Sequence, residues 1–176
     1  MKNSGNTILI TGGGSGIGAA LAQRSHDAGN TVIVAGRRRE ALEATIAGRP
    51  NMHAVTLDIE SPEAIEAFAQ ELVAAHPALN VLINNAGIMQ HEDLGSRRDL
   101  AGAEATITTN LLGPIRLTNA LVDHLKAQAD AAIVNVTSGL AFVPLVLAAT
   151  YSATKAAIHS YTISLRDALG GQVEVV

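Results

Sequence analysis

Tyr151 and Lys155 are the residues of this chain whose types and spacing most directly suggest chemistry. They lie four positions apart in a segment with helical periodicity, so both side chains share one face of the predicted helix. An ammonium beside a phenol favours the phenolate and lowers a tyrosine pKa from its ordinary value of about 10, which suits an acid–base group. Taken alone, the pair is explained more simply as a tyrosine at a helix start with a solvated lysine one turn later.

A glycine-rich turn near the N-terminus predicts a binding site for a dinucleotide. The turn follows an apolar strand, precedes a predicted helix, and consists of Thr11, Gly12, Gly13, Gly14, Ser15, Gly16, Ile17 and Gly18. Glycines let the backbone approach a pyrophosphate, and the helix N-terminus offers free N–H groups and a partial positive charge. No lysine follows Gly18, which excludes the P-loop of nucleoside triphosphatases. The remaining alternative is a turn that only packs the helix on the strand.

Two glycine spacings are possible within this turn. The dinucleotide fingerprint fits Gly14, Gly16 and Ala19, but this spacing starts late after the strand. The spacing Gly12, Gly16 and Gly18 uses the turn from its first glycine, and we prefer it.

Three arginines after the second predicted strand bear on which cofactor is bound. Dehydrogenases that use NAD carry an acidic residue near this strand end to hold the ribose hydroxyls, and none is present here. Instead Arg37, Arg38 and Arg39 begin a predicted helix, where cations meet the positive end of the helix dipole. The 2′-phosphate of NADP is the anion that this position would meet. The arginines therefore favour NADP(H), with NAD(H) possible, although a solvated basic patch is the simpler alternative.

Polar residues also follow three later strands. Asp58 closes the third, residues 84–87 (Asn-Asn-Ala-Gly) close the fourth, and residues 137–139 (Thr-Ser-Gly) close the fifth. Each alone is an ordinary turn, because Asn, Asp, Ser and Gly are common turn residues. Together they converge on the carboxyl edge of a parallel sheet, where ligands of such sheets bind.

Six short apolar runs and five helix-like stretches must position these residues. The predicted strands are 8–10, 31–35, 53–57, 80–83, 132–136 and 173–176. The predicted helices are 16–29, 38–48, 62–75, 101–127 and 150–169. The alternation predicts an α/β fold with a Rossmann-type doubly wound parallel sheet and helices on both faces.

Composition excludes several classes of function. The chain has 176 residues and 48% hydrophobic content, which suits one domain over residues 1–176. It has no cysteine, so a disulfide framework is excluded and a cytoplasmic setting is expected. A net charge of −4 and 2% aromatic content argue against nucleic acid, and no apolar run is long enough to span a membrane. The six histidines form no pair with metal-site spacing, so no metal is expected.

In combination these residues resemble the short-chain dehydrogenase/reductase family. Its marks are a Thr-Gly-x-x-x-Gly-x-Gly turn, an Asn-Asn-Ala-Gly strand end and a Tyr-x-x-x-Lys helix, and all three occur here in order. The extended branch of the family spaces its glycines as Gly-x-x-Gly-x-x-Gly, and here Ser15 occupies the middle position, so the resemblance is to the classical branch. Segments 86–89 and 110–116 further resemble a bacterial subgroup, the DltE-like oxidoreductases.

The resemblance implies a reaction and a set of site residues. Ser138 and Tyr151 would hydrogen-bond a substrate carbonyl oxygen, and Tyr151 would exchange a proton with it. Lys155 would act on Tyr151 and hold the nicotinamide ribose, and Asn110 would anchor a water. The implied cofactor contacts are Thr11, Gly12, Gly14, Ser15, Gly16, Ile17, Gly18, Arg37, Arg38, Asp58, Ile59, Asn85, Ala86, Gly87, Tyr151 and Lys155. Family members also pair Ala- and Leu-rich helices between subunits, which implies a homodimer or homotetramer.

The chain departs from the family at its end. Family members continue past the position of Val176 into a Pro-Gly segment, a substrate-covering region and a further strand. We therefore expect this chain to be part of a longer protein. A noncatalytic NADP-binding module is the alternative; the truncation favours it, and Ser138, Tyr151 and Lys155 oppose it.

Overall fold

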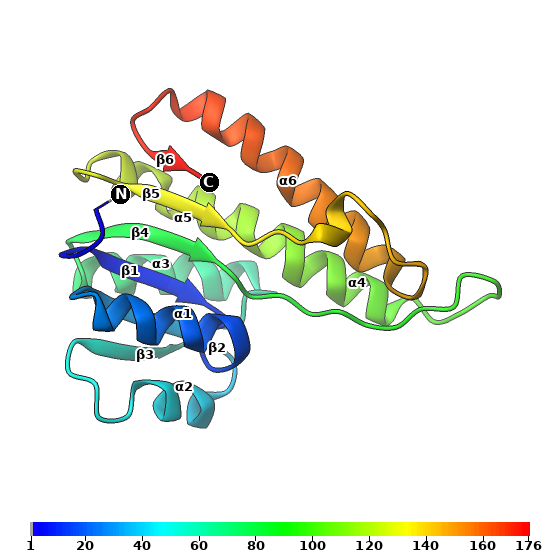
Figure 1. Cartoon of the computed structure of the whole chain (residues 1–176), viewed down its shortest axis with the longest axis horizontal. Helices are drawn as coiled ribbons and strands as arrows, with labels where there is room; N and C mark the ends of the chain where they lie inside the picture. The colour runs from blue at the N-terminus through cyan, green and yellow to red at the C-terminus, as the bar shows by residue number, and fades with distance from the viewer. Residues whose placement is uncertain (1) are drawn as a thin grey trace.

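A parallel sheet of six strands organises the computed structural model, which describes residues 2–176. The strands are β1 (Thr7–Thr11), β2 (Thr31–Gly36), β3 (Met52–Thr56), β4 (Leu79–Asn84), β5 (Ala132–Asn135) and β6 (Glu174–Val175). They pair in the order β3-β2-β1-β4-β5-β6, and every pairing is parallel. The strand order therefore reverses between β1 and β4, and the carboxyl ends of the strands form one edge (Figure 1).

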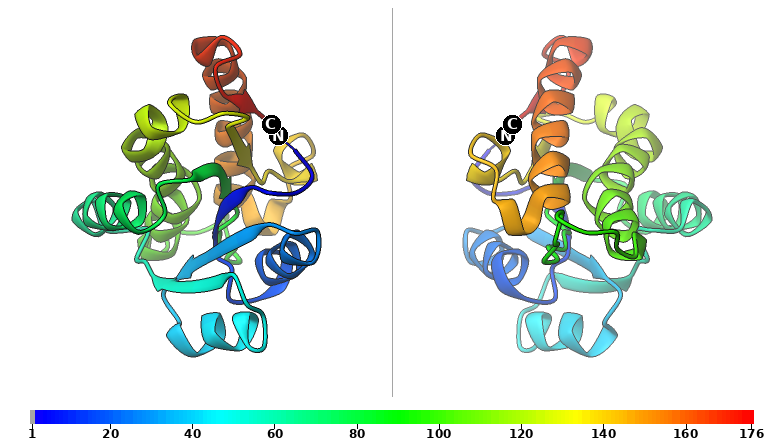
Figure 2. Two further views of the ribbon diagram at one scale, coloured as in Figure 1. Left: turned by 90° about the vertical axis from the view of Figure 1, so that its left-hand side faces the viewer. Right: turned by 90° about the vertical axis from the view of Figure 1, so that its right-hand side faces the viewer.

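Helices cover both faces of this sheet. The α-helices are α1 (Gly16–Asp27), α2 (Arg39–Ile46), α3 (Pro62–Ala75), α4 (Ala101–Ile107), α5 (Gly113–Lys126) and α6 (Ala149–Leu169). Figure 2 shows α1 on one side of the sheet and α3 and α5 on the other. One apolar core joins the sheet to α3, α5 and the end of α6, and a second lies beneath α1 and α2. The predicted doubly wound fold is confirmed.

The strands are apolar because they are buried between two helical layers. Residues of β4 are all buried, and alternate positions of β1 enter different cores, with Leu9 in one and Ile8 and Ile10 in the other. Such strands appear in the sequence as continuous apolar runs. All six predicted strands lie within two residues of the observed bounds.

One predicted helix is corrected by the structure. Residues 101–127 were expected to form a single α-helix, but a π-helical turn, η1 (Thr108–Leu112), separates α4 from α5. Pro114 gives a physical reason, because it has no N–H to donate to the carbonyl of residue 110. Gly113 also packs closely on the β3–α3 connection, where a Cβ would lie 2.6 Å from Ile59 Cγ1. Single π turns often occur at functional sites.

No helix within residues 2–176 combines the length and the apolar character that crossing a bilayer requires.

Candidate cofactor and catalytic site

A cavity of about 480 Å³ lies at the carboxyl edge of the sheet, where the strand order reverses. Its volume is in the range of small-molecule sites. The predicted site residues that line it are Thr11, Gly12, Ser15, Ile17, Gly18, Arg37, Arg38, Ile59, Asn85, Ala86, Gly87, Tyr151 and Lys155. The structure therefore brings together the glycine turn, the arginines and the Tyr-x-x-x-Lys helix around one space.

The glycine turn is closely packed against the end of β4. Gly12 has a left-handed φ of +67°, and a Cβ there would lie 2.9 Å from Ala86 Cα. A Cβ at Gly18 would overlap the Gly12 carbonyl and lie 2.5 Å from Asn85 Nδ2. The first turn of α1 can approach the strand only because both residues lack a side chain. This observation agrees with the preferred spacing, in which these two glycines do the close packing.

Thr11 joins the glycine turn to the Asn-Asn-Ala-Gly strand end. Its Oγ1 accepts hydrogen bonds from the backbone N–H groups of Asn85 and Ala86, both at 3.0 Å. Asn85 returns a bond from its Nδ2 to the Thr11 carbonyl at 2.9 Å. The two motifs thus form one hydrogen-bonded unit at the reversal of strand order, although 74 positions separate Thr11 from Asn85.

The two arginines that line the cavity differ in their partners. Arg37 makes an ion pair with Glu60 at 3.0 Å. Arg38 instead donates to the hydroxyl of Ser15 at 3.0 Å, and no carboxylate within residues 2–176 makes an ion pair with it. Ser15 precedes α1 and its hydroxyl makes no capping bond to that helix. Arg38 therefore keeps its charge available beside the N-terminus of α1.

Lys155 lies over the ring of Tyr151, as their spacing predicts. The ammonium is 5.8 Å from the ring centroid and donates to the Val136 carbonyl at 2.7 Å. Lys155 is only 5% exposed, and this burial lowers its pKa. The cavity wall thus includes a phenol and a cation as well as the two arginines.

Asn110 occupies the π turn and holds the loop that follows β4. Its Oδ1 accepts from the Ile88 N–H and its Nδ2 donates to the Ile88 carbonyl, both at 2.8 Å. Nδ2 also donates to the Thr154 hydroxyl at 3.2 Å, which ties the turn to α6. Gly87 lies close by, since a Cβ there would be 3.3 Å from Asn110 Oδ1 and 3.7 Å from Lys155 Nζ.

Five predicted site residues do not line the cavity: Gly14, Gly16, Asp58, Asn110 and Ser138. Gly14 packs on α2, and Asp58 is exposed with its carboxylate accepting from the Glu60 N–H at 3.0 Å. Ser138 caps the short 3₁₀ helix η2 (Gly139–Ala141), and its hydroxyl accepts from the Leu140 N–H at 3.1 Å. Because η2 packs on α6, Ser138 still lies in the neighbourhood of the helix that carries Tyr151.

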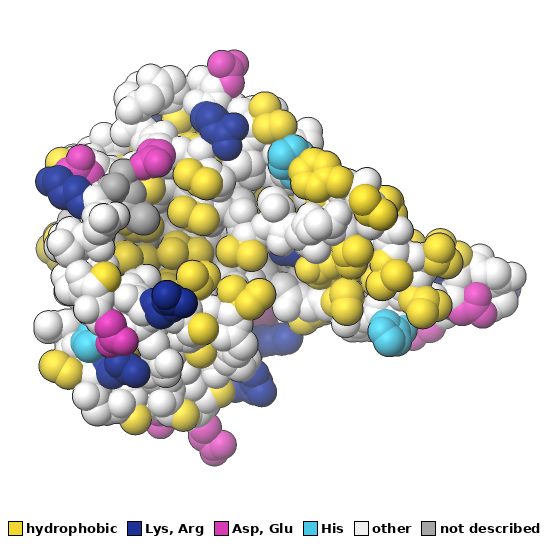
Figure 3. All heavy atoms as spheres, viewed as in Figure 1, with side chains coloured by type: hydrophobic (Ala, Val, Ile, Leu, Met, Phe, Trp, Pro, Cys, Tyr) yellow, Lys and Arg dark blue, Asp and Glu magenta, His cyan; other side chains and the backbone are white. Residues whose placement is uncertain are grey.

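Exposed apolar side chains gather near the beginning of α6. Four side chains between η2 and α6 are each more than half exposed: Phe142, Val143, Val146 and Leu147. The last two belong to a second 3₁₀ turn, η3 (Val146–Ala148), which directly precedes α6. Figure 3 shows hydrophobic surface on this part of the molecule.

Residues 2–176 contain no group of three His, Asp or Glu side chains placed to hold a metal ion.

Sequence reasoning missed several residues that shape the site. Glu60 pairs with Arg37 and also accepts from the Thr109 hydroxyl at 2.9 Å, which links the arginine end to the π turn. Glu92 bonds Thr150, the residue before Tyr151. These contacts join residues that are 23 to 58 positions apart, so no local sequence pattern indicates them.

The lowered pKa of Lys155 gives a pH-dependent prediction. Between the lowered value and 10.5 the unfolded chain binds a proton that the folded chain has released, so stability rises with pH across this window. Below it, the buried ammonium is a constant cost. Lys155→Met removes this cost, so it should raise the thermal midpoint at pH 7. This advantage should shrink as the pH approaches 10.5, as thermal unfolding at several pH values would show.

Lys126→Met is the matched control, because Lys126 is exposed at the end of α5. The prediction would be contradicted if the thermal midpoints of Lys155→Met and the wild type differed by the same amount at every pH.

Comparison with known proteins now gives the family. The family model described as short chain dehydrogenase matches residues 6–176. An uncharacterized oxidoreductase, DltE of Bacillus subtilis, is 41% identical over 100% of this chain and 71% of that protein. A short-chain dehydrogenase structure from Streptomyces avermitilis has a TM-score of 0.90 at 31% identity, and covers 97% of this chain.

A further structure, the closed form of a serine dehydrogenase complexed with NADP⁺, has a TM-score of 0.89 at 29% identity over 96% of this chain and 69% of that one. The present chain spans 63% of the Streptomyces chain, which is less than two thirds of it. The family match nevertheless extends over nearly all of the present sequence, and the chain belongs to the short-chain dehydrogenase family.

Proposed function

We propose that this chain is the cofactor-binding and catalytic part of an NADP(H)-dependent oxidoreductase that transfers a hydride between the nicotinamide and a carbonyl or alcohol substrate. One observation carries the proposal: a glycine turn at a helix N-terminus and the Tyr151–Lys155 pair border the same cavity. On the family resemblance and the absence of cysteine, we also propose a cytoplasmic homodimer or homotetramer.

The residues present fit a dinucleotide. Gly12 and Gly18 line the cavity and let the first turn of α1 pack on the end of β4, and no side-chain cap occupies the first N–H groups of α1. This end of the cavity would hold the pyrophosphate. Asn85, Ala86 and Gly87 line the same cavity as Tyr151 and would contact the nicotinamide half of the cofactor. Asp58 and Ile59 stay predicted contacts of the adenosine half.

Each polar residue near Tyr151 would have a distinct task. When bound, the nicotinamide would supply or accept the hydride. Tyr151 would exchange a proton with the substrate oxygen, and Ser138 would donate a hydrogen bond to the same oxygen. Lys155 would stabilise the ionised phenol by its charge and bind the nicotinamide ribose. Asn110, already bonded to Ile88 and Thr154, would anchor the water that passes protons from solvent.

Arg38 gives a test of the cofactor preference. Arg38→Ala should weaken NADPH binding by roughly tenfold or more, because it removes a charged hydrogen bond to the 2′-phosphate. NADH lacks that phosphate, so its affinity should change by less than about twofold. Fluorescence titration of both cofactors measures the two dissociation constants. Arg39→Ala is the control, since Arg39 pairs with Glu43 on the same helix and does not line the cavity. An equal loss for both cofactors would contradict the assignment.

A panel of ketones, aldehydes and quinones tests the function itself. The expected result is loss of NADPH absorbance with at least one member. A noncatalytic NADP-binding module would instead change NADPH fluorescence and oxidise none of the cofactor, which would overturn the proposed reaction.

A further inference from the structure

We propose that Glu92 is a positioning residue for Tyr151, which it serves by clamping the first turn of α6 to the loop between β4 and α4. The proposal rests on the function proposed above. Glu92 does not line the cavity, so any effect it has on the reaction passes through the residues that it holds.

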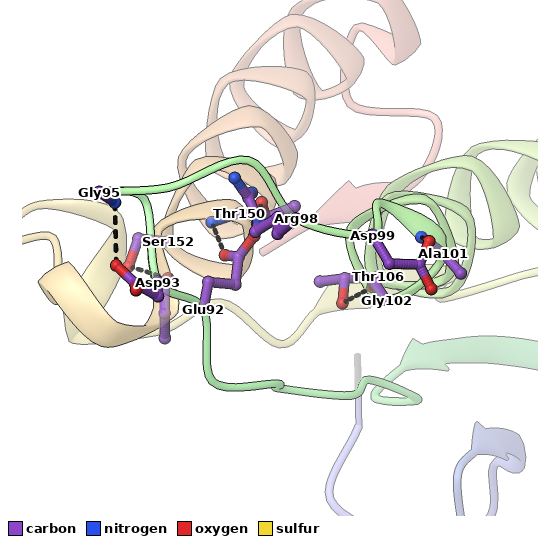
Figure 4. A network of polar contacts seen from close by, with 11 residues as sticks. Glu92, Asp93, Gly95, Arg98, Asp99, Ala101, Gly102, Thr106, Thr150 and Ser152 are labelled. Atoms are coloured by element: carbon purple, nitrogen blue, oxygen red, sulfur yellow. Dashed lines mark hydrogen bonds and ion pairs between the residues drawn. The ribbon is translucent and has the colours of Figure 1, made fainter.

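Glu92 binds the segment that immediately precedes Tyr151 through both its side chain and its backbone. Its Oε1 accepts from the Thr150 hydroxyl and its Oε2 from the Thr150 backbone N–H, both at 2.6 Å. Its own N–H donates to the Leu147 carbonyl at 2.9 Å. Figure 4 shows the Glu92 side chain directed at Thr150, with Arg98 beside it. Three hydrogen bonds from one residue therefore hold residues 147–150.

The beginning of α6 needs such a partner. Ala148 occupies the capping position and has no side chain that can accept a hydrogen bond, so it offers no side-chain acceptor to the first N–H groups of this 21-residue helix. Glu92 supplies this acceptor from 58 positions away, at the second residue of the helix. A negative charge is also favourable at a helix N-terminus.

Charge and burial fit a structural role for Glu92. The side chain is 7% exposed and also pairs with Arg98 at 2.7 Å. The two hydrogen bonds from Thr150, followed by the hydrogen bond and the charge of Arg98, lower the pKa of Glu92 against the opposing effect of burial, which keeps it ionised at neutral pH.

The clamp joins the two walls of the site. The loop that contains Glu92 begins with the cavity residues Asn85 to Gly87, and the helix that it holds carries Tyr151 and Lys155. Ser152 adds a local tie, donating to the Ala148 carbonyl at 2.9 Å. A misplacement on the order of 1 Å at a reacting group can cost about a hundredfold in rate. Losing the clamp should therefore lower kcat more than cofactor affinity.

The test uses the double variant Glu92→Ala/Arg98→Ala, which removes one negative and one positive charge together. We expect kcat for NADPH oxidation to fall by roughly tenfold or more, while the NADPH dissociation constant changes by less than about twofold. A second readout needs no substrate. The chain has two tyrosines and no tryptophan, so in a Tyr161→Phe background Tyr151 is the sole emitter. Acrylamide quenching of its fluorescence should rise by roughly twofold as the first turn of α6 loosens.

Three companions make the outcome decisive. Asp93→Asn changes charge at the next loop residue, which bonds only Gly95 and Ser96 of that loop in the described hydrogen bonds, and should leave both readouts unchanged. Glu92→Gln retains an acceptor for the Thr150 N–H and should restore part of the lost kcat. If the double variant does not fold, Thr150→Val removes the hydroxyl bond alone and is measured in the same way.

Unchanged quenching and unchanged kcat in a folded clamp variant would overturn the proposal. Increased quenching in a protein whose wild type oxidises no NADPH would leave Glu92 as the holder of Tyr151, and would reject the proposed reaction instead.

Discussion

Tyr151→Phe should reduce turnover by a factor on the order of 10² to 10⁴, because it removes the proton that the substrate oxygen exchanges. The ring and its contact with Lys155 remain, so the cavity keeps its shape. NADPH affinity should therefore stay within about twofold of the wild type. NADPH absorbance, followed with the best substrate of the carbonyl panel, measures the rate, and fluorescence titration measures the affinity.

The second tyrosine of the chain provides the control. Tyr161 lies on the same helix, and burial raises its pKa while a hydrogen bond with Thr118 opposes that rise. It does not line the cavity. Tyr161→Phe should thus lose one hydrogen bond and retain turnover. Wild-type carbonyl reduction by Tyr151→Phe would show that another group supplies the proton.

Gly18→Ala should have the largest effect on cofactor binding. The added Cβ would overlap the Gly12 carbonyl and press on Asn85 Nδ2, so α1 must move away from the end of β1. We expect NADPH affinity to fall by roughly tenfold or more, since the turn and the helix N-terminus move together. Overpacking of this kind should lower the free energy of unfolding by about 1–3 kcal/mol. Fluorescence titration and urea unfolding measure the two effects.

Gly16→Ala separates overlap from backbone strain in the same turn. Gly16 has a left-handed φ of +54°, but a Cβ there would have no neighbour within 4 Å. Its substitution should cost only the strain of that conformation, roughly 1 kcal/mol. Equal losses of stability at both positions would argue against close packing as the reason for glycine at position 18.

Much of the fold could be predicted because buried parallel strands and amphipathic helices leave local periodic patterns. The six strands and the order of helices follow from those patterns. The prediction of one continuous helix over residues 101–127 was wrong at residues 108–112, which form a π turn. The apolar residues keep a helical periodicity through this turn, so the periodic pattern did not reveal the break that Pro114 favours.

The contacts of the site likewise fall into those that local spacing predicts and those that only the tertiary fold creates. Spacing within one turn or one helix places Gly12 near Gly18 and Lys155 over Tyr151, since a few bonds of known geometry connect each pair. Arg37 and Arg38 differ because Glu60, in the connection after β3, pairs with Arg37, whereas Arg38 donates to Ser15. The clamp of Glu92 on Thr150 likewise depends on the path of a loop.

By itself, then, the sequence determined the strands and helices, the glycine turn and the pairing of Tyr151 with Lys155, because hydrophobic periodicity and local covalent geometry dictate them. Only the tertiary structure decided which arginine keeps its charge available and which carboxylate holds the start of α6. Those outcomes are set by side chains that meet through folding across 23 and 58 positions. At such separations, the packing of helices on the sheet determines which groups become neighbours.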